Sequence, residues 1–407
     1  MKFESIELSS ICRTNAYSYS QNDNWQFVNY LDTGNITQNK ISEIQHIDLQ
    51  SEKLPSRAKR KVKHDSILFS TVRPNQLHYG IIKSQPENFL VSTGFAVIDI
   101  DETKAVADFI YYYLIQKDII QHLQAIAEQS TSAYPSIKPS DIENLIINIP
   151  DLKTQSRIAA VLSALDDKIE LNNKINENLE QQAQAIFKSW FVDFEPFGGV
   201  MPQDWKKATL NDVCKKITDG SHYSPKDDPS ANIPMLSVKD MLSSGFSFQS
   251  CKHIDEDEFQ KMIANDCVPL KNDILVAKDG SYLKEIFICN CKQRIAILSS
   301  IAIFRPNTEI IIPEILLALL KSPAVLQEVK DNYVSGSVLP RIVLKDFKKL
   351  RLILPSMKVQ EQVAPILHNI RLQIDINCEE NTRLSALRDT LLPKLMNGEI
   401  DVSAVKI

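Results

Sequence analysis

The strongest constraint on the fold is an internal repeat. A shift of 205 residues aligns positions 135–179 with 340–384 without a gap, and 13 of the 45 aligned positions are identical. Average residue usage would give about three identities by chance. Two upstream segments also correspond: Leu8 to Cys12 resembles Leu210 to Cys214, and Ser66 to Leu68 resembles Asp273 to Leu275. The chain of 407 residues is therefore predicted to contain two copies of one unit of roughly 200 residues.

Each copy ends in a segment with the periodicity of a long helix. Apolar residues and asparagines recur at alternating spacings of four and three, which is the pattern of a coiled-coil seam. The seam of the first copy comprises Ile158, Leu162, Leu165, Ile169, Asn172, Asn176, Leu179, Ala183, Ile186 and Trp190. The seam of the second copy comprises Val363, Leu367, Ile370, Ile374, Asn377, Asn381, Leu384, Arg388, Leu391 and Leu395. We expect the two helices to pair; the alternative is that each packs on its own globular segment.

Asparagine occupies two consecutive seam positions in both copies, Asn172 and Asn176 in the first and Asn377 and Asn381 in the second. A buried seam asparagine lowers stability but fixes the register and orientation of the partner helix. These four residues are therefore predicted to set the register. A helix of about 35 residues spans roughly 50 Å, so a pair of such helices is expected to hold two domains apart.

The expected helix ends divide the chain into four parts. Globular segments are predicted at 1–150 and 198–355, and helical regions at 151–197 and 356–407. Thr154 or Ser156 is the candidate N-cap of the first helix. Pro365 and Pro393 predict that the second helix is shorter or more bent than the first.

The globular segments mix short apolar runs typical of strands with one helical stretch each. The strand-like runs are 67–69, 96–98, 274–276 and 301–304, and the helical stretches are 108–127 and 313–329. This mixture indicates the α+β class. The predicted architecture is two globular mixed α/β domains separated by two long helices.

Composition and motifs exclude several classes of protein. Hydrophobic residues make up 43% and charged residues 24% of the chain, as in ordinary globular proteins. The chain contains no G-x-G and no G-x-x-x-x-G-K-[ST], so no loop for a nucleotide or S-adenosylmethionine is expected. H-E-x-x-H and G-x-S-x-G are also missing. The seven cysteines never occur as C-x-x-C, which predicts reduced thiols and no metal site.

Location and charge also limit the expected partners. The sequence has neither a long apolar run nor the pattern of a signal peptide, so a cytoplasmic protein without membrane contact is expected. The net charge is −5, so any contact with nucleic acid must come from local basic clusters.

One such cluster places five cations within seven residues: Arg57, Lys59, Arg60, Lys61 and Lys63. This density suits the neutralisation of DNA phosphates, although a solvated helix face is the alternative. The loop that follows is rich in side chains that can bond base edges, since Arg can bond guanine and Asn or Gln can bond adenine. Its predicted DNA contacts are Thr71, Arg73, Asn75, Gln76, His78 and Tyr79.

The second globular segment offers weaker candidates for DNA contact. Asp-Gly-Ser, which occurs twice in it, is commonly just a turn. The predicted residues are Ser221, His222, Tyr223, Lys226, Lys239, Lys278, Ser281, Tyr282 and Lys284.

Six segments, together with the duplicated layout, carry a family resemblance. They are SILFSTVRPN (66–75), STGFAV (92–97), KIELN (168–172), AIFKSWFVDF (185–194), KDGSY (278–282) and LLPKLMNGEI (391–400). Over essentially its full length the chain resembles the specificity subunits of type I restriction-modification systems. The resemblance implies two target-recognition domains, each reading one half of a split, asymmetric DNA site, and two helical regions that pair antiparallel. It also implies a subunit without enzymatic activity or a cofactor of its own.

The same resemblance implies the partners. Two modification subunits bring S-adenosylmethionine and methylate adenine in double-stranded DNA, and two restriction subunits bring ATP and Mg²⁺ for translocation and cleavage. The helical regions are expected to dock the modification subunits through exposed apolar groups. These groups are Phe187, Trp190, Phe191 and Phe194 in the first copy and Leu391, Leu392 and Leu395 in the second. Packing of the aromatic group inside its own domain is the alternative.

Two other functions compete with DNA recognition at this point. The first is a coiled-coil scaffold without DNA specificity. The second is a nuclease or methyltransferase acting alone, which would require cofactor motifs that the sequence lacks.

Overall fold

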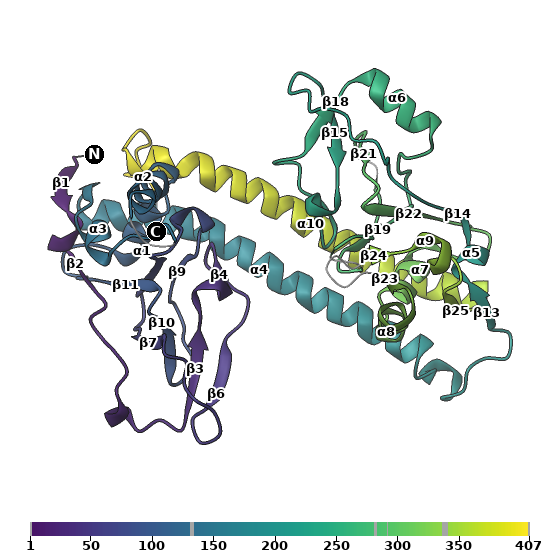
Figure 1. Cartoon of the computed structure of the whole chain (residues 1–407), viewed down its shortest axis with the longest axis horizontal. Helices are drawn as coiled ribbons and strands as arrows, with labels where there is room; N and C mark the ends of the chain where they lie inside the picture. Colours follow the sequence, from purple (N-terminus) through teal and green to yellow (C-terminus); the bar gives the residue numbers. More distant parts are fainter. Residues whose placement is uncertain (1, 131–133, 281–282, 291, 336–340, 406–407) are drawn as a thin grey trace. The chain divides into compact units, whose positions relative to one another are not determined.

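The computed structural model of the chain describes residues 2–130, 134–280, 283–290, 292–335 and 341–405. The chain forms two compact units, one made of Met1–Ile169 with Thr382–Ile407 and the other of Glu170–Asn381. Two helices of 40 residues each, α4 (Leu152–Phe191) and α10 (Met357–Met396), are labelled in Figure 1. Each helix contributes one part to each unit. Across the described ranges, no helix is both long and apolar enough to cross a bilayer.

The globular part of the first unit is built on two four-stranded sheets. One has the order β2 (Cys12–Thr14), β11 (Phe95–Ile100), β8 (Ile67–Ser70) and β9 (Tyr79–Ile81). The other has the order β6 (Gln45–Asp48), β3 (Phe27–Leu31), β10 (Phe89–Ser92) and β7 (Ala58–Lys61). Every residue of β8 and β11 is buried, because alternate side chains of these strands enter two different apolar clusters. The strands predicted at 67–69 and 96–98 are confirmed.

Smaller elements complete the first unit. A two-stranded sheet pairs β1 (Glu4–Glu7) with β12 (Ile146–Ile149), and a short hairpin pairs β4 (Ile36–Thr37) with β5 (Lys40–Ile41). The helices are α1 (Ala107–Leu114), α2 (Lys117–Glu128) and α3 (Pro139–Glu143). The single helix predicted over 108–127 is wrong, because the extended backbone of Gln116 (ψ 141°) ends α1 and starts α2.

The second unit repeats this layout. Its main sheet has the order β14 (Cys214–Asp219), β22 (Ile301–Pro306), β19 (Ile274–Ala277) and β20 (Ile286–Ile288), and β13 (Lys206–Thr209) pairs with β25 (Arg351–Leu354). A three-stranded sheet has the order β18 (Lys252–Ile254), β15 (Ile233–Leu236) and β21 (Ala296–Ile297). The main sheets of the two units have equivalent strand orders, which confirms the internal repeat. The strands predicted at 274–276 and 301–304 are present.

The remaining elements of the second unit are short. Two hairpins pair β16 (Met241–Leu242) with β17 (Gly245–Phe246) and β23 (Val334–Ser335) with β24 (Arg341–Ile342). The helices are α5 (Leu210–Val213), α6 (Glu256–Ala264), α7 (Pro313–Leu320), α8 (Pro323–Asn332) and α9 (Leu344–Phe347). One helix was predicted over 313–329, but Ser322 caps a new helix at Pro323, since proline favours the first position of a helix over its interior.

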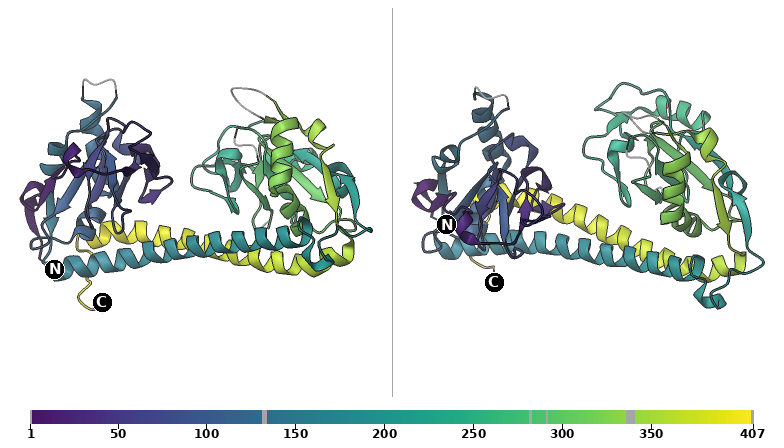
Figure 2. Two further views of the ribbon diagram at one scale, coloured as in Figure 1. Left: turned by 90° about the horizontal axis from the view of Figure 1, so that it is seen from below. Right: turned by 60° about the horizontal axis from the view of Figure 1, so that its bottom comes forward.

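Both long helices complete the apolar core of each unit. In the first unit, Ile158 and Leu162 of α4 and Leu392 and Leu395 of α10 are buried among residues of the sheets and of α1 to α3. In the second unit, Phe187 and Phe191 of α4 and Val363 and Leu367 of α10 are buried in the same way. Both views in Figure 2 show the strands of each unit on one side of its helix segments. Each long helix thus belongs to the cores of both units. The alternative, in which each helix packs only on its own globular segment, is wrong.

Two expectations about the helices are wrong: α10 is not shorter than α4, and the N-cap of α4 is a different residue. Pro365 and Pro393 both lie inside α10, which is as long as α4. Each proline removes one backbone hydrogen bond, but both are exposed while the seam beside them is buried. The N-cap of α4 is not Thr154 or Ser156 but Asp151, whose carboxylate accepts from the Thr154 amide (3.0 Å) and hydroxyl (2.9 Å).

A buried glutamine fixes the first turn of each long helix. Gln155 donates from Nε2 to the Pro150 carbonyl (2.8 Å), and its Oε1 accepts from the Val106 amide (2.9 Å) at the start of α1. Gln360, its equivalent in the repeat, accepts in the same way from the Ile312 amide (2.9 Å) at the start of α7. The two glutamines are 1% and 0% exposed. Water therefore has no access to replace these bonds.

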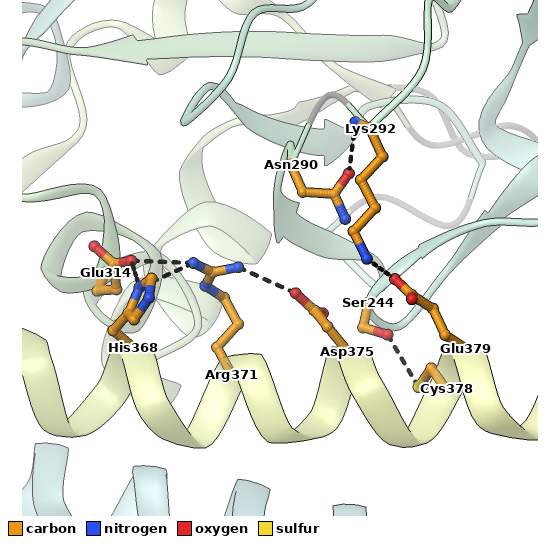
Figure 3. Close-up of polar contacts among 9 residues, drawn as sticks. All are labelled: Ser244, Asn290, Lys292, Glu314, His368, Arg371, Asp375, Cys378 and Glu379. Atoms are coloured by element: carbon orange, nitrogen blue, oxygen red, sulfur yellow. Dashed lines mark hydrogen bonds and ion pairs between the residues drawn. The ribbon is translucent and has the colours of Figure 1, made fainter.

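Polar contacts attach α10 to the globular part of the second unit, as Figure 3 shows. The Glu314 carboxylate accepts a hydrogen bond from Arg371 (3.2 Å) and lies 2.8 Å from Nδ1 of His368. Arg371 also donates to Asp375 (3.1 Å), and burial raises the pKa of that carboxyl group. Two further pairs continue along α10, Lys292 with Glu379 and Ser244 with Cys378.

We expect Gln155→Ala to lower the free energy of unfolding by about 2 to 3 kcal/mol, because it leaves a buried amide and a buried carbonyl without partners. Gln182 lies exposed on the same helix, so Gln182→Ala should change stability by less than about 0.5 kcal/mol. Chemical denaturation of the two variants measures both effects. Equal stabilities would show that the glutamine bonds do not hold α4 in place.

Candidate functional site

Four seam asparagines bond across the two long helices within the second unit. Asn172 donates to Oδ1 of Asn381 (2.9 Å), and Asn377 donates to Oδ1 of Asn176 (2.7 Å). Asn172 and Asn377 are 1% and 5% exposed. The partners lie in opposite chain directions, so the helix segments are antiparallel here. A slip of either helix by one residue would separate both pairs, which makes these residues suited to fix the register.

Arg388 is the one charged residue of the predicted seam, and it has a specific partner in the first unit. Its guanidinium donates to Asp166 of α4 (2.7 Å) and to the neighbouring Asp389 (2.8 Å). Asp166 also accepts from the hydroxyl of Tyr112 (2.7 Å). Burial, followed by the charge of Asp166, raises the pKa of Tyr112, so its hydroxyl keeps the proton that it donates.

The loop between β8 and β9, residues 71–78, is held from three sides. The Thr71 hydroxyl donates to a carbonyl of the turn between β10 and β11 (2.9 Å). Nδ1 of His78 lies 2.7 Å from a carbonyl oxygen of β4. The backbone amide of Asn75 donates to a glutamine side chain of α2 (3.2 Å). The side chains of Asn75 and Gln76 are exposed at the tip of this fixed loop.

Arg73 occupies an unusual backbone conformation in loop 71–78. Its φ is 48°, in the left-handed region, which costs a residue with a side chain roughly 1 to 2 kcal/mol. The repeat supplies a comparison, because Ile67 pairs with Ile81 as Ile274 pairs with Ile288. The two loops therefore have equal length, and the residue equivalent to Arg73 is Gly280, with a φ of 69°. The fold demands left-handed backbone here, and only the first unit places a side chain on it.

Tyr79 does not belong to the exposed surface, and its prediction as a DNA contact is wrong. It is 6% exposed and lies in the core of the first unit, where its ring packs 6.2 Å from that of Phe69. As the first residue of β9 it points to the covered face of the sheet.

Sequence reasoning missed a segment that lies beside loop 71–78. The amide of Arg73 donates to the carbonyl of Pro135 (2.9 Å), and the Ile137 amide donates to the carbonyl of Thr71 (2.8 Å). The guanidinium carbon of Arg73 lies 5.1 Å from the ring centroid of Tyr134, which is 60% exposed. The start of the repeated block at Pro135 was the only sequence signal next to this tyrosine.

The basic cluster lies on and beside β7, a strand at the edge of its sheet, and not on a helix. Arg57, Lys59 and Lys63 are exposed, whereas Arg60 and Lys61 are half-buried. β7 belongs to the sheet that does not contain β8, so the structure places the basic cluster and loop 71–78 on different sheets.

Lys61 already has a partner for its charge. Its ammonium pairs with Asp23 and lies 5.2 Å from the ring centroid of Trp25. The hydrogen bond from Lys61 lowers the pKa of Asp23, so this carboxylate is charged near neutral pH. Lys61 is therefore a weaker candidate for phosphate contact than Lys59 and Lys63.

The second unit leaves part of its predicted set exposed. His222, Tyr223, Lys226, Lys239 and Lys284 are exposed. Ser221 is 8% exposed and its hydroxyl donates to the carbonyl of Tyr223 (2.7 Å), so its prediction as a DNA contact is wrong. Lys278 is half-buried in an ion pair with Asp219. Ser281 and Tyr282 lie outside the described residues.

The aromatic group at the end of α4 is not an exposed docking patch. Phe187 and Phe191 are 8% and 6% exposed and lie in the core of the second unit, and Trp190 and Phe194 pack against that core. Trp205, which directly precedes β13, packs against this group, tilted against Phe191 and edge-on to Phe194. The counterpart in α10 is also covered: Leu392 and Leu395 are core residues and Leu391 packs on them. The apolar side chains at the ends of α4 and α10 are therefore used to complete the cores of the second and the first unit, respectively.

The described residues also bear on metal and thiol chemistry. Among the residues that the structure describes, no three His, Cys, Asp or Glu side chains are placed to hold a metal ion. Burial raises the pKa of the Cys12 and Cys214 thiols to about 12, so both are protonated at neutral pH.

Comparisons with known proteins agree with this layout. A family model described as "Type I restriction modification DNA specificity domain" matches residues 1–181 and 202–386. The type I restriction enzyme HindI specificity subunit of Haemophilus influenzae is 28% identical, covering 91% of this chain and 94% of that protein. The MjaIX specificity subunit of Methanocaldococcus jannaschii is 28% identical over 73% of this chain and 70% of that protein.

A solved structure also shares the fold. The crystal structure of a type I restriction-modification system S subunit from M. genitalium superposes with a TM-score of 0.57 at 15% identity. The match covers 97% of this chain and 96% of that one.

Proposed function

Since the chain belongs to the family of type I restriction-modification DNA specificity domains, whose role is the recognition of DNA sequence, we propose that each of its two units reads one half of a bipartite, asymmetric DNA site. Two copies of one fold supply two reading surfaces. Different side chains on equivalent loops would give the two halves different sequences.

The observation that carries this proposal is Arg73 on left-handed backbone where the other unit has Gly280. Glycine is the residue that this conformation favours. An arginine at this position does not stabilise the left-handed backbone, so we attribute its presence to a function of its side chain. Arginine is also the side chain most often used to read a base in the major groove. Loop 71–78 is therefore the proposed reading loop of the first unit.

Phosphate contacts would position the duplex without reading its sequence. The exposed cations Arg57, Lys59 and Lys63 on and beside β7 suit this task. In the second unit, the exposed cations suited to phosphate contact are Lys226, Lys239 and Lys284. The net charge of −5 leaves room for partner subunits to share these contacts.

The long helices are proposed to form an antiparallel coiled coil that sets the spacing between the two half-sites. The bonds Asn172 to Asn381 and Asn377 to Asn176 support this arrangement in the second unit. The pair Asp166 with Arg388 supports it in the first.

The partners proposed are double-stranded DNA, two modification subunits that bring S-adenosylmethionine, and two restriction subunits that bring ATP and Mg²⁺. Catalysis would belong to those subunits and not to this chain. Exposed apolar residues of the helices are better placed to dock a modification subunit than the buried aromatic group. Leu171 and Ile376 support this view, because they are equivalent in the repeat and 51% and 50% exposed.

We expect Arg73→Gly to remove discrimination at one base pair of one half-site, a loss of about 1 to 3 kcal/mol. The fold should be retained within about 1 kcal/mol, because glycine relieves the left-handed strain. Binding of the full complex to cognate and singly substituted duplexes measures the first effect, and thermal unfolding the second. Unchanged discrimination at every position would exclude Arg73 as a base-reading residue.

The double variant Lys59→Ala with Lys63→Ala should weaken binding about equally for cognate and random DNA. Loss of two phosphate contacts should reduce the slope of log affinity against log salt concentration by about two. Lys61→Ala is the matched control, because its charge is already paired with Asp23. Measuring DNA affinity of each variant across a range of salt concentrations gives this slope. An equal reduction of the slope by Lys61→Ala would contradict the assignment of Lys59 and Lys63 as the phosphate contacts.

A further inference from the structure

The position of Tyr134 points to a role in the reading of DNA that the sequence did not suggest. Tyr134 is 60% exposed and lies on the surface of the first unit. The guanidinium carbon of Arg73 lies over this ring, 5.1 Å from the ring centroid. This distance lies within the range of a cation–π contact.

The backbone brings the two side chains together in a fixed way. The Arg73 amide donates to the carbonyl of Pro135 (2.9 Å), and Val72 forms an isolated β-bridge with Ser136. The second unit has the equivalent bridge, between Asp279 and Arg341. This backbone contact therefore belongs to the repeated fold, whereas the side chains placed on it are specific to the first unit.

The geometry leaves the donors of Arg73 available. A ring that covers the flat face of a guanidinium does not use its N–H groups, which lie in the plane of the group. Within the described part of the chain, the guanidinium of Arg73 forms no hydrogen bond or ion pair. Two parallel N–H groups in this plane match O6 and N7 of guanine.

We propose that Tyr134 is a positioning residue that holds the guanidinium of Arg73 edge-on for one guanine of the first half-site. This inference rests on the proposed function and deepens it, because it names the base that is read and the residue that orients the reader. Tyr134 acts through Arg73, so the second half-site is independent of it. The second unit has glycine at the position of Arg73 and reads its half by other side chains.

The experiment uses the full chain in complex with the modification subunit from the same host. A duplex library with two randomised blocks yields the wild-type sequence preference. Each guanine of that sequence is then replaced by 7-deazaguanine, which lacks the N7 acceptor. We expect one guanine, in one block only, at which this change weakens wild-type binding by about tenfold or more.

Three variants separate the roles of the two residues. Arg73→Gly should abolish the effect of 7-deazaguanine at that position. Tyr134→Leu should weaken cognate binding by about two- to fivefold and shrink the effect, since it removes the ring. Tyr134→Phe keeps the ring and should behave like the wild type. Preference in the other block should stay unchanged in all three, which shows that the chain remains folded.

The outcomes distinguish the two proposals. Absence of any enriched sequence for the wild type would overturn the proposed function itself. A different result is an enriched sequence in which no guanine shows a 7-deazaguanine effect that is present in the wild type and lost in Arg73→Gly. That result would overturn the inference that Arg73 reads a guanine. Equal binding by Tyr134→Leu and Tyr134→Phe would overturn the role of Tyr134.

Discussion

The fold depends on the fact that neither globular part closes its own hydrophobic core. In the first unit, Leu162 near the start of α4 and Leu395 near the end of α10 are buried in one cluster, although they are far apart in the sequence. In the second unit, Phe191 and Val363 play the corresponding parts. Burial of a large apolar side chain contributes about 1.5 to 3 kcal/mol, so the helices are held to each unit by the same force that folds it. Each helix is thereby fixed relative to the domain that it completes.

The repeat separates what the fold needs from what the function needs. Gln155 and Gln360 make the same buried bonds in both units, because both helices must begin at the same place on their domains. Arg73 and Gly280 share a backbone conformation but differ completely in chemistry. A shared scaffold with divergent loops is the arrangement expected of a protein that reads two different sequences with one fold.

The sequence predicted the features that depend on local pattern. The repeat, the two long helices and the buried strands follow from spacing and from apolar runs, and the seam asparagines bond to each other in the second unit. The sequence did not predict features that depend on contacts between segments far apart in the chain. Residue type alone did not show that Tyr79 faces the core or that Lys61 is paired with Asp23. Tyr134 could not be found, because its relation to Arg73 arises only when the chain folds back.

The aromatic group at the end of α4 illustrates the same limit in another way. Amphipathic spacing shows which side of a helix is apolar but not what covers it. From its spacing alone, Phe191 could belong to a docking surface or to a core. Its contact with Trp205 in the folded chain places it in the core. The second helix was expected to be shorter or more bent than the first. It instead continues through Pro365 to the same length, because the buried seam outweighs the loss of one backbone bond.

The most direct test of the central claim is a map of N6-methyladenine across the host genome with and without this gene. The account predicts that deletion abolishes methylation at one gapped motif with two different halves, and that restoring the gene restores it. A map that is unchanged by deletion, in a host whose modification subunit is expressed, would contradict the claim that this chain directs the complex to its DNA sequence.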